Sequence, residues 1–335
     1  QYVMSSLSLI KSRHSYAPEE GLGHVHLDAP IALQYARMKD LLGSGSIEMI
    51  DENLHWKKSP QYETQAIGLV GCPDIPRNAA RVQNMQKDVR YMLGGQVIAG
   101  LIHYDHETNT EDSSQFHQVF GADAINGNAD ANLADVLGFN VTDLPQVMST
   151  SLVPAYEDIP DDDMQLYFAN EMSFFLSQGC KQHCLFCAVK NRSRLALDSD
   201  KIIFRDGEIY RDMDVVEEDF RYLVDRADSL GVTELNIYLS NLDLLQTPEK
   251  LIEFAEIVTS IKQSYPQVTI NMRALAIAQS FVAAHRNRDD KKCGRKAKQA
   301  IKDAGLQSIG FGIDGATPEV WRSQGKSINT EDNCI

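Results

Sequence analysis

Apolar and polar positions follow two different rhythms along the first 140 residues. Short, largely apolar runs at residues 2–10, 46–50, 66–70 and 97–102 predict strands. Apolar residues that recur every three or four positions predict helices over residues 31–41 and 80–92, the second closed by Gly94 and Gly95. Alternating strands and helices are typical of a parallel sheet, so this part is expected to be a doubly wound, Rossmann-like α/β domain.

The same rhythm returns in the second half of the chain. Apolar runs predict further strands at residues 172–176, 234–239, 268–272 and 308–313. Amphipathic stretches predict the helices between them, over residues 215–230, from Pro248 onward, and as one long charged segment that ends near Gly305. Thr247 and Pro248 form a typical helix start, a capping residue followed by proline.

Prolines and acidic residues interrupt the pattern between the two halves. The stretch 145–166 contains Pro145, Pro154, Pro160 and three consecutive aspartates, which predicts an irregular linker. The expected organisation is a first domain over 1–145, a linker over 146–166 and a second α/β domain over 167–335.

The net charge of the chain argues against nucleic acids as binding partners. Lys and Arg number 32 and Asp and Glu number 47, so the formal charge is −15. An acidic chain repels phosphate backbones, and the basic run from Arg286 to Lys298 is interrupted by Asp289 and Asp290, so it indicates a solvated helix face. No apolar run reaches the length of a membrane span, and no export signal is readable. The sequence therefore predicts a soluble, cytoplasmic protein without nucleic-acid binding.

Three cysteines stand close together directly after the strand predicted at 172–176. Cys180, Cys184 and Cys187 are separated by three and two residues, which lets one loop bring three thiolates to one metal or cluster. A structural zinc site normally has four protein ligands, which His183 or Cys293 would complete. A four-iron cluster held by three cysteines instead keeps one iron open for another molecule.

With Phe186 just before the last cysteine, this loop resembles the signature loop of the radical S-adenosylmethionine enzymes. The resemblance implies a [4Fe-4S] cluster on Cys180, Cys184 and Cys187, with S-adenosylmethionine bound to the open iron beside Phe186. It also implies reductive cleavage of S-adenosylmethionine to a 5′-deoxyadenosyl radical, with electrons from a donor such as flavodoxin or ferredoxin. The family's barrel usually has six strand–helix units and about four are recognisable here, so the second domain is expected to be a partial (β/α) barrel, truncated at its C-terminus.

Three segments later in the chain resemble the parts of the family that contact S-adenosylmethionine. Ser240, Asn241 and Asp243 follow the second barrel strand, where relatives bind the amino group of S-adenosylmethionine, although the usual Gly-Gly-Glu is absent. Arg273 matches a basic residue that pairs with the methionine carboxylate, and a surface salt bridge is the alternative. Asp314 follows the fourth strand, where it would hold the ribose hydroxyls or simply cap a helix.

The first domain resembles the cobalamin-binding domain of one subclass of these enzymes. The similarity lies in five short segments in the family's order, at residues 27–33, 47–51, 66–71, 97–103 and 121–130. It implies corrin contacts at strand ends, which are Gly71, Gly100, His103 and Gly127. No Asp-x-His-x-x-Gly motif follows the first strand, so a histidine ligand to cobalt is not indicated.

The resemblance implies a cobalamin-dependent methyltransferase that acts on an unactivated carbon of a small molecule or peptide. Two alternatives remain open at this point. One is a radical S-adenosylmethionine enzyme of other chemistry, such as cyclisation or rearrangement, whose first domain does not bind cobalamin. The other is a zinc-stapled interaction module without catalysis.

Overall fold

The computed structural model describes fourteen stretches of the chain, and the statements below concern these residues. They are 7–11, 26–27, 29–43, 45–55, 66–70, 90–94, 103–105, 110–112, 118, 125–126, 139–180, 208–286, 291–313 and 317–323. The chain divides into two compact units with a boundary between Gln146 and Val147, and residues 26–29 belong to the second unit. Both units are α/β with parallel sheets, as the sequence predicts.

A five-stranded sheet forms the first unit, and every pairing in it is parallel. In spatial order its strands are β3 (Ile47–Asp51), β1 (Leu7–Lys11), β4 (Ala66–Val70), β5 (Arg90–Gly94) and β8 (Ile125–Asn126). Numbered along the chain this is 2-1-3-4-5, the order of flavodoxin-like folds. The strand order therefore reverses between β1 and β4, at the position where such sheets bind ligands at their carboxyl edge.

Helix α1 (Ala29–Leu42) confirms the helix predicted over residues 31–41. Its buried residues include Ile31, Tyr35 and Met38, which recur at helical spacing. The helix ends at Gly43, whose φ of 81° suits glycine, and its N–H donates to the carbonyl of Lys39. The rest of the unit contains the antiparallel pair β6 (His103–Asp105) and β7 (Thr110–Asp112), and the short 3-10 helix η2 (Val141–Asp143).

One prediction in the first unit is wrong. The end of the predicted helix 80–92 is strand β5, which lies between β4 and β8. The run Tyr91–Leu93 is apolar and short, and a central parallel strand has the same pattern as the buried end of a helix, so periodicity alone does not separate them. The strand predicted at 97–102, and residues 2–6 of the first predicted strand, lie outside the described residues.

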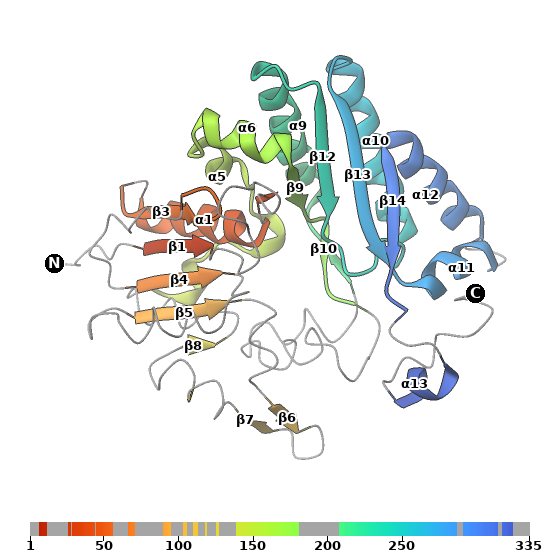
Figure 1. Cartoon of the computed structure of the whole chain (residues 1–335), viewed down its shortest axis with the longest axis horizontal. Coiled ribbons are helices and arrows are strands. Elements are labelled where there is room, and N and C mark those ends of the chain that lie inside the picture. Colours follow the sequence, from red (N-terminus) through yellow and green to blue (C-terminus); the bar gives the residue numbers. More distant parts are fainter. Residues whose placement is uncertain are drawn as a thin grey trace. The chain divides into compact units, whose positions relative to one another are not determined.

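A second parallel sheet of five strands forms the second unit (Figure 1). In spatial order its strands are β2 (His26–Leu27), β9 (Glu171–Phe174), β12 (Glu234–Leu239), β13 (Thr269–Ala276) and β14 (Leu306–Phe311). The last four follow chain order, as the strands of a (β/α) barrel do. Strand β2, from the N-terminal part of the chain, was not predicted and pairs with the outer edge of β9.

Helices cover one face of this sheet and follow the predicted strand–helix order (Figure 1). They are α9 (Met213–Ser229), α10 (Pro248–Ser264) and α12 (Lys291–Ala304). Helix α11 (Ala278–Arg286) packs against α12, and the short α13 (Pro318–Ser323) follows β14 in the chain. Phe174, Phe220 and Phe254 form the centre of the core, with edge-to-face contacts at ring-centroid distances of 5.2 Å and 5.6 Å. The long charged helix predicted to end near Gly305 is two helices, α11 and α12.

The stretch predicted to be an irregular linker contains helices of the second unit. These are η3 (Val147–Ser149), α5 (Val153–Glu157) and α6 (Asp161–Ala169). Pro154 lies in the first turn of α5, and the three aspartates occupy the first turn of α6. Proline and acidic residues are favourable at helix starts, so the residues that suggested a break mark helix N-termini instead. Within the described part of the chain, no helix has both the length and the apolar character needed to cross a membrane.

Candidate functional site

The cysteine motif begins at the carboxyl edge of the second sheet. Strand β9 leads into the short strand β10 (Ser177–Gln178), then Gly179, and then Cys180, which is partly exposed. Gly179 has a φ of 91°, a left-handed conformation that favours glycine. Cys184, Cys187 and Phe186 lie outside the described residues, and within the described ones no three His, Cys, Asp or Glu side chains gather as metal ligands.

The chain returns beside the point where it left. Strand β11 (Ile209–Tyr210) pairs antiparallel with β10, so that Ser177 lies opposite Tyr210 and Gln178 opposite Ile209. The next backbone N–H, that of Arg211, donates to the carbonyl of Leu176 at 2.8 Å. The two ends of the cysteine-bearing segment are therefore fixed side by side at the carboxyl edge of β9.

A half-buried carboxylate, that of Glu208, lies at this junction. Glu208 accepts hydrogen bonds from the hydroxyls of Ser177 at 2.5 Å and Thr247 at 2.9 Å. The amide of Asn241 donates to the Ser177 oxygen at 2.6 Å. Burial raises the pKa of the Glu208 carboxyl, the two hydroxyls oppose that shift, and the nearby Asp243 adds to it. Glu208 could not be predicted as a site residue, because it lies next to a two-residue strand that shows no hydrophobic period in the sequence.

The residues predicted to contact the amino group of S-adenosylmethionine follow β12 at the same edge. The Asn241 side chain is almost completely buried, and its Oδ1 has no hydrogen-bond partner among the described residues. A buried carbonyl oxygen without a donor is costly, so this atom suits a ligand with an N–H group. Ser240 lies beside β9, where its backbone N–H donates to the carbonyl of Phe174.

Asp243 has a different set of contacts. Its carboxylate is fully buried and accepts from the backbone N–H of Ile277 at 3.1 Å and from the hydroxyl of Ser280 at 2.5 Å. These donors lie just after β13 and in α11, so Asp243 ties the end of β12 to the next strand and helix. Asn241, rather than Asp243, therefore presents the acceptor that lacks a partner in the described structure.

Arg273 lies in the middle of β13, on the face of the sheet away from the helices. Its Nε and Nη2 bind the two carboxylate oxygens of Glu171, each at 2.5 Å, and its guanidinium lies 4.3 Å from the ring centroid of Tyr238. This bidentate pair corresponds to the alternative of a partly exposed salt bridge. A methionine carboxylate at Arg273 would have to compete with Glu171. The other predicted contact on this side, Asp314, lies outside the described residues.

Fewer of the predicted cobalamin contacts can be located. Gly71, Gly100 and Gly127 lie outside the described residues, and His103 begins β6, in the antiparallel pair rather than in the parallel sheet. The structure shows instead a buried ion pair between Lys11 and Asp51, with Nζ and Oδ2 3.5 Å apart. These residues end β1 and β3, next to the point where the strand order reverses. In the sequence, Lys11 and Asp51 are charged residues that each end an apolar run, and this feature could have predicted the pair.

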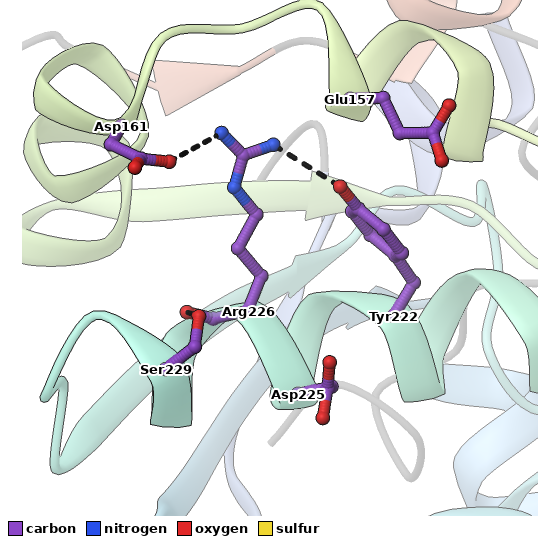
Figure 2. Close-up of a pocket in the computed structure, with 6 residues that line it drawn as sticks. All are labelled: Glu157, Asp161, Tyr222, Asp225, Arg226 and Ser229. Carbon is purple, nitrogen blue, oxygen red and sulfur yellow. Dashed lines mark hydrogen bonds and ion pairs between the residues drawn. The ribbon is translucent and has the colours of Figure 1, made fainter.

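A hollow elsewhere in the second unit is lined by residues that hold helices together and is not a candidate ligand site. Figure 2 shows it beside Arg226 on α9, with Asp161 of α6 and Tyr222 nearby. Arg226 donates to Asp161 at 2.9 Å and to the carbonyls of Tyr156 and Ile159, which fixes the ends of α5 and α6. Because α9 runs antiparallel to β12, its C-terminal half lies toward the amino end of the strand. In α/β folds that end contributes to stability rather than to chemistry.

Comparison with known proteins shows a likeness of fold alone. No family model and no curated protein sequence matches the chain. A solved structure of the cobalamin-dependent S-adenosylmethionine radical enzyme OxsB, with aqua-cobalamin and S-adenosylmethionine bound, is similar with a TM-score of 0.64 at 12% identity. The radical S-adenosylmethionine methyltransferase TsrM from Kitasatospora setae, with tryptophan and a cosubstrate analogue bound, is similar with a TM-score of 0.62 at 10% identity.

These similarities extend over both units of the chain. Each comparison covers 98% of this chain, but only 46% of the OxsB chain and 64% of the TsrM chain. The protein thus has the arrangement of a five-stranded parallel unit followed by strand–helix units, and it spans about half to two thirds of the length of the structures that it resembles.

Proposed function

We propose that the chain is the cofactor-binding part of a cobalamin-dependent radical S-adenosylmethionine enzyme. The observation that carries the proposal is the position of the cysteine motif. It leaves the carboxyl edge of a parallel sheet whose strands β9, β12, β13 and β14 follow chain order, directly beside the buried acceptor of Asn241. The similarity in fold to OxsB and TsrM over 98% of the chain supports the same assignment.

The residues at this edge fit the groups that the proposal requires. Cys180, with Cys184 and Cys187, supplies three soft thiolate donors, the ligand type of iron–sulfur clusters. Asn241 supplies an oxygen that would accept a hydrogen bond from the amino group of S-adenosylmethionine. When bound, the cluster and S-adenosylmethionine would supply the 5′-deoxyadenosyl radical.

The first unit is proposed to hold cobalamin at its carboxyl edge. Two observations support this: the 2-1-3-4-5 strand order, and the Lys11–Asp51 pair at the strand ends. Methyl transfer to a carbon of a small molecule or peptide is the proposed chemistry, with flavodoxin or ferredoxin as electron donor.

Anaerobic reconstitution with iron and sulfide tests the assignment. The chain is expected to bind about four iron atoms and, after reduction in the presence of S-adenosylmethionine, to form 5′-deoxyadenosine. Cys184→Ser is expected to lose both properties, since it removes one of the three thiolates.

The opposite results have distinct meanings. About one zinc per chain with no uptake of iron would contradict the proposal and favour a zinc-stapled module. A chain that binds iron and cleaves S-adenosylmethionine, but loses the corrin absorption band of added hydroxocobalamin on gel filtration, would contradict only the cobalamin part.

A further inference from the structure

Glu208 is a half-buried carboxylate at the point where the chain returns from its cysteine-bearing segment. It binds Ser177, at the other end of that segment, and Thr247, at the start of α10. These partners are 31 and 39 residues away in sequence, and Asn241, 64 residues from Ser177, supports the Ser177 oxygen. We call Ser177, Glu208, Asn241 and Thr247 the loop clasp.

Thr247 links the start of α10 to Glu208. It is the N-cap residue of α10, a position where a threonine hydroxyl usually accepts a hydrogen bond from the first turn of its helix. No such capping bond forms here, and the hydroxyl donates to Glu208. The hydrogen bond that the Thr247 hydroxyl makes is therefore with the base of the cysteine-bearing segment and not with its own helix.

Glu208 is half-buried, and this partial burial raises the pKa of its carboxyl. No lysine or arginine pairs with it among the described residues. Ser177 and Thr247 occupy one carboxylate oxygen each, so the group joins two elements that have no backbone pairing with one another. A carboxylate that joins the loop base to the start of a helix through two hydroxyls fits a positioning role.

We propose that Glu208 is a positioning residue that clasps both ends of the cysteine loop to the start of α10, and so determines how firmly the loop holds its cluster. This inference rests on the proposed function, because it assumes that Cys180, Cys184 and Cys187 bind iron. Without the clasp, the contacts that remain at the loop base include the two-residue pairing of β10 with β11, the backbone bond from Arg211 to Leu176 and the buried pair of Arg211 with Asp219.

The rate at which a ferrous chelator removes iron from the anaerobically reconstituted chain tests the clasp. Glu208→Ala is expected to lose iron about tenfold faster than the unchanged protein, because two hydrogen bonds to a charged group are lost. Thr247→Val, which removes one of them, is expected to lose iron about threefold faster. Glu217→Gln, an exposed glutamate on α9, is the matched control and should leave the rate unchanged.

Gly294→Ala separates this role from general destabilisation. That substitution crowds the contact between α11 and α12, away from the clasp, and should lower the stability of the chain without faster iron loss. Equal rates for the unchanged protein, Glu208→Ala and Thr247→Val would overturn the clasp while leaving the proposed function intact. Rates that rise equally in Gly294→Ala would also overturn it.

Two further outcomes are distinguishable. Failure of the unchanged protein to bind iron would overturn the proposed function, and the clasp with it. If Glu208→Ala does not fold, Thr247→Val carries the test, because it keeps the carboxylate and changes a single hydroxyl at nearly constant volume.

Discussion

Arg211 and Asp219 form a fully buried ion pair in the second unit. The Arg211 guanidinium also donates to the carbonyl of Thr150, and the Asp219 carboxylate accepts from the backbone N–H of Leu152 and the hydroxyl of Ser151, each at 2.8 Å. The pair thereby joins α9 to the chain before α5 and to the residue that follows β11. The position of the chain directly after β11, at the base of the cysteine-bearing segment, is therefore fixed by two charged side chains that are shielded from solvent.

Replacing Asp219 by asparagine leaves the Arg211 cation buried without its counter-ion. Breaking a buried pair in this way typically costs about 3–5 kcal/mol. We expect Asp219→Asn to lower the free energy of unfolding by that order in urea denaturation, whereas Glu217→Gln on the same helix, whose partner Arg221 is exposed, should change it by less than about 1 kcal/mol. Equal effects of the two substitutions would contradict this interpretation.

Helices and strands with a clear hydrophobic period could be predicted from the sequence. Elements that form through contacts between distant residues could not. Strands β4 and β12 have the predicted bounds, because their apolar runs are flanked by polar residues or turns. The end of the helix predicted over 80–92 is strand β5, since a short apolar run fits both a strand and the end of a helix. Strands β2, β10 and β11 have two residues each, too few for any period to show.

The candidate site divides in the same way. The motif Cys180–Cys187 and its place after β9 are local features of the sequence, so they were predictable. Glu208 depends on partners 31 and 39 residues away, and its role appears only when the fold brings them together. Asp243 was predicted to contact a ligand, but the structure shows its carboxylate bound to Ile277 and Ser280.

The pairing of α11 with α12 depends on one glycine. A Cβ atom on Gly294 would lie 2.7 Å from the Cβ of Ala284, closer than packed carbon atoms approach. Gly294→Ala should therefore destabilise the second unit by about 1–3 kcal/mol through overpacking, although alanine favours helices. Thermal unfolding measures the change, with the exposed Lys296→Ala on α12 as control. A higher melting temperature for Gly294→Ala would contradict the close contact.

Across the whole molecule, two parallel sheets of different strand order occur in one chain. The first unit has the order 2-1-3-4-5, and β9, β12, β13 and β14 of the second unit follow chain order. The fold of the chain is similar to that of the solved structures over 98% of its length. The face of the second sheet away from the helices bears partly exposed polar and apolar residues, including Arg273, Asn271 and Leu275.

The central claim is that three cysteines hold a four-iron cluster with one iron open to S-adenosylmethionine. Electron paramagnetic resonance of the reconstituted, reduced chain, recorded before and after addition of S-adenosylmethionine, tests it most directly. The account predicts a [4Fe-4S] signal whose g-values shift when S-adenosylmethionine is added. A cluster signal that S-adenosylmethionine leaves unchanged, or a chain that takes up zinc and gives no cluster signal, would contradict it.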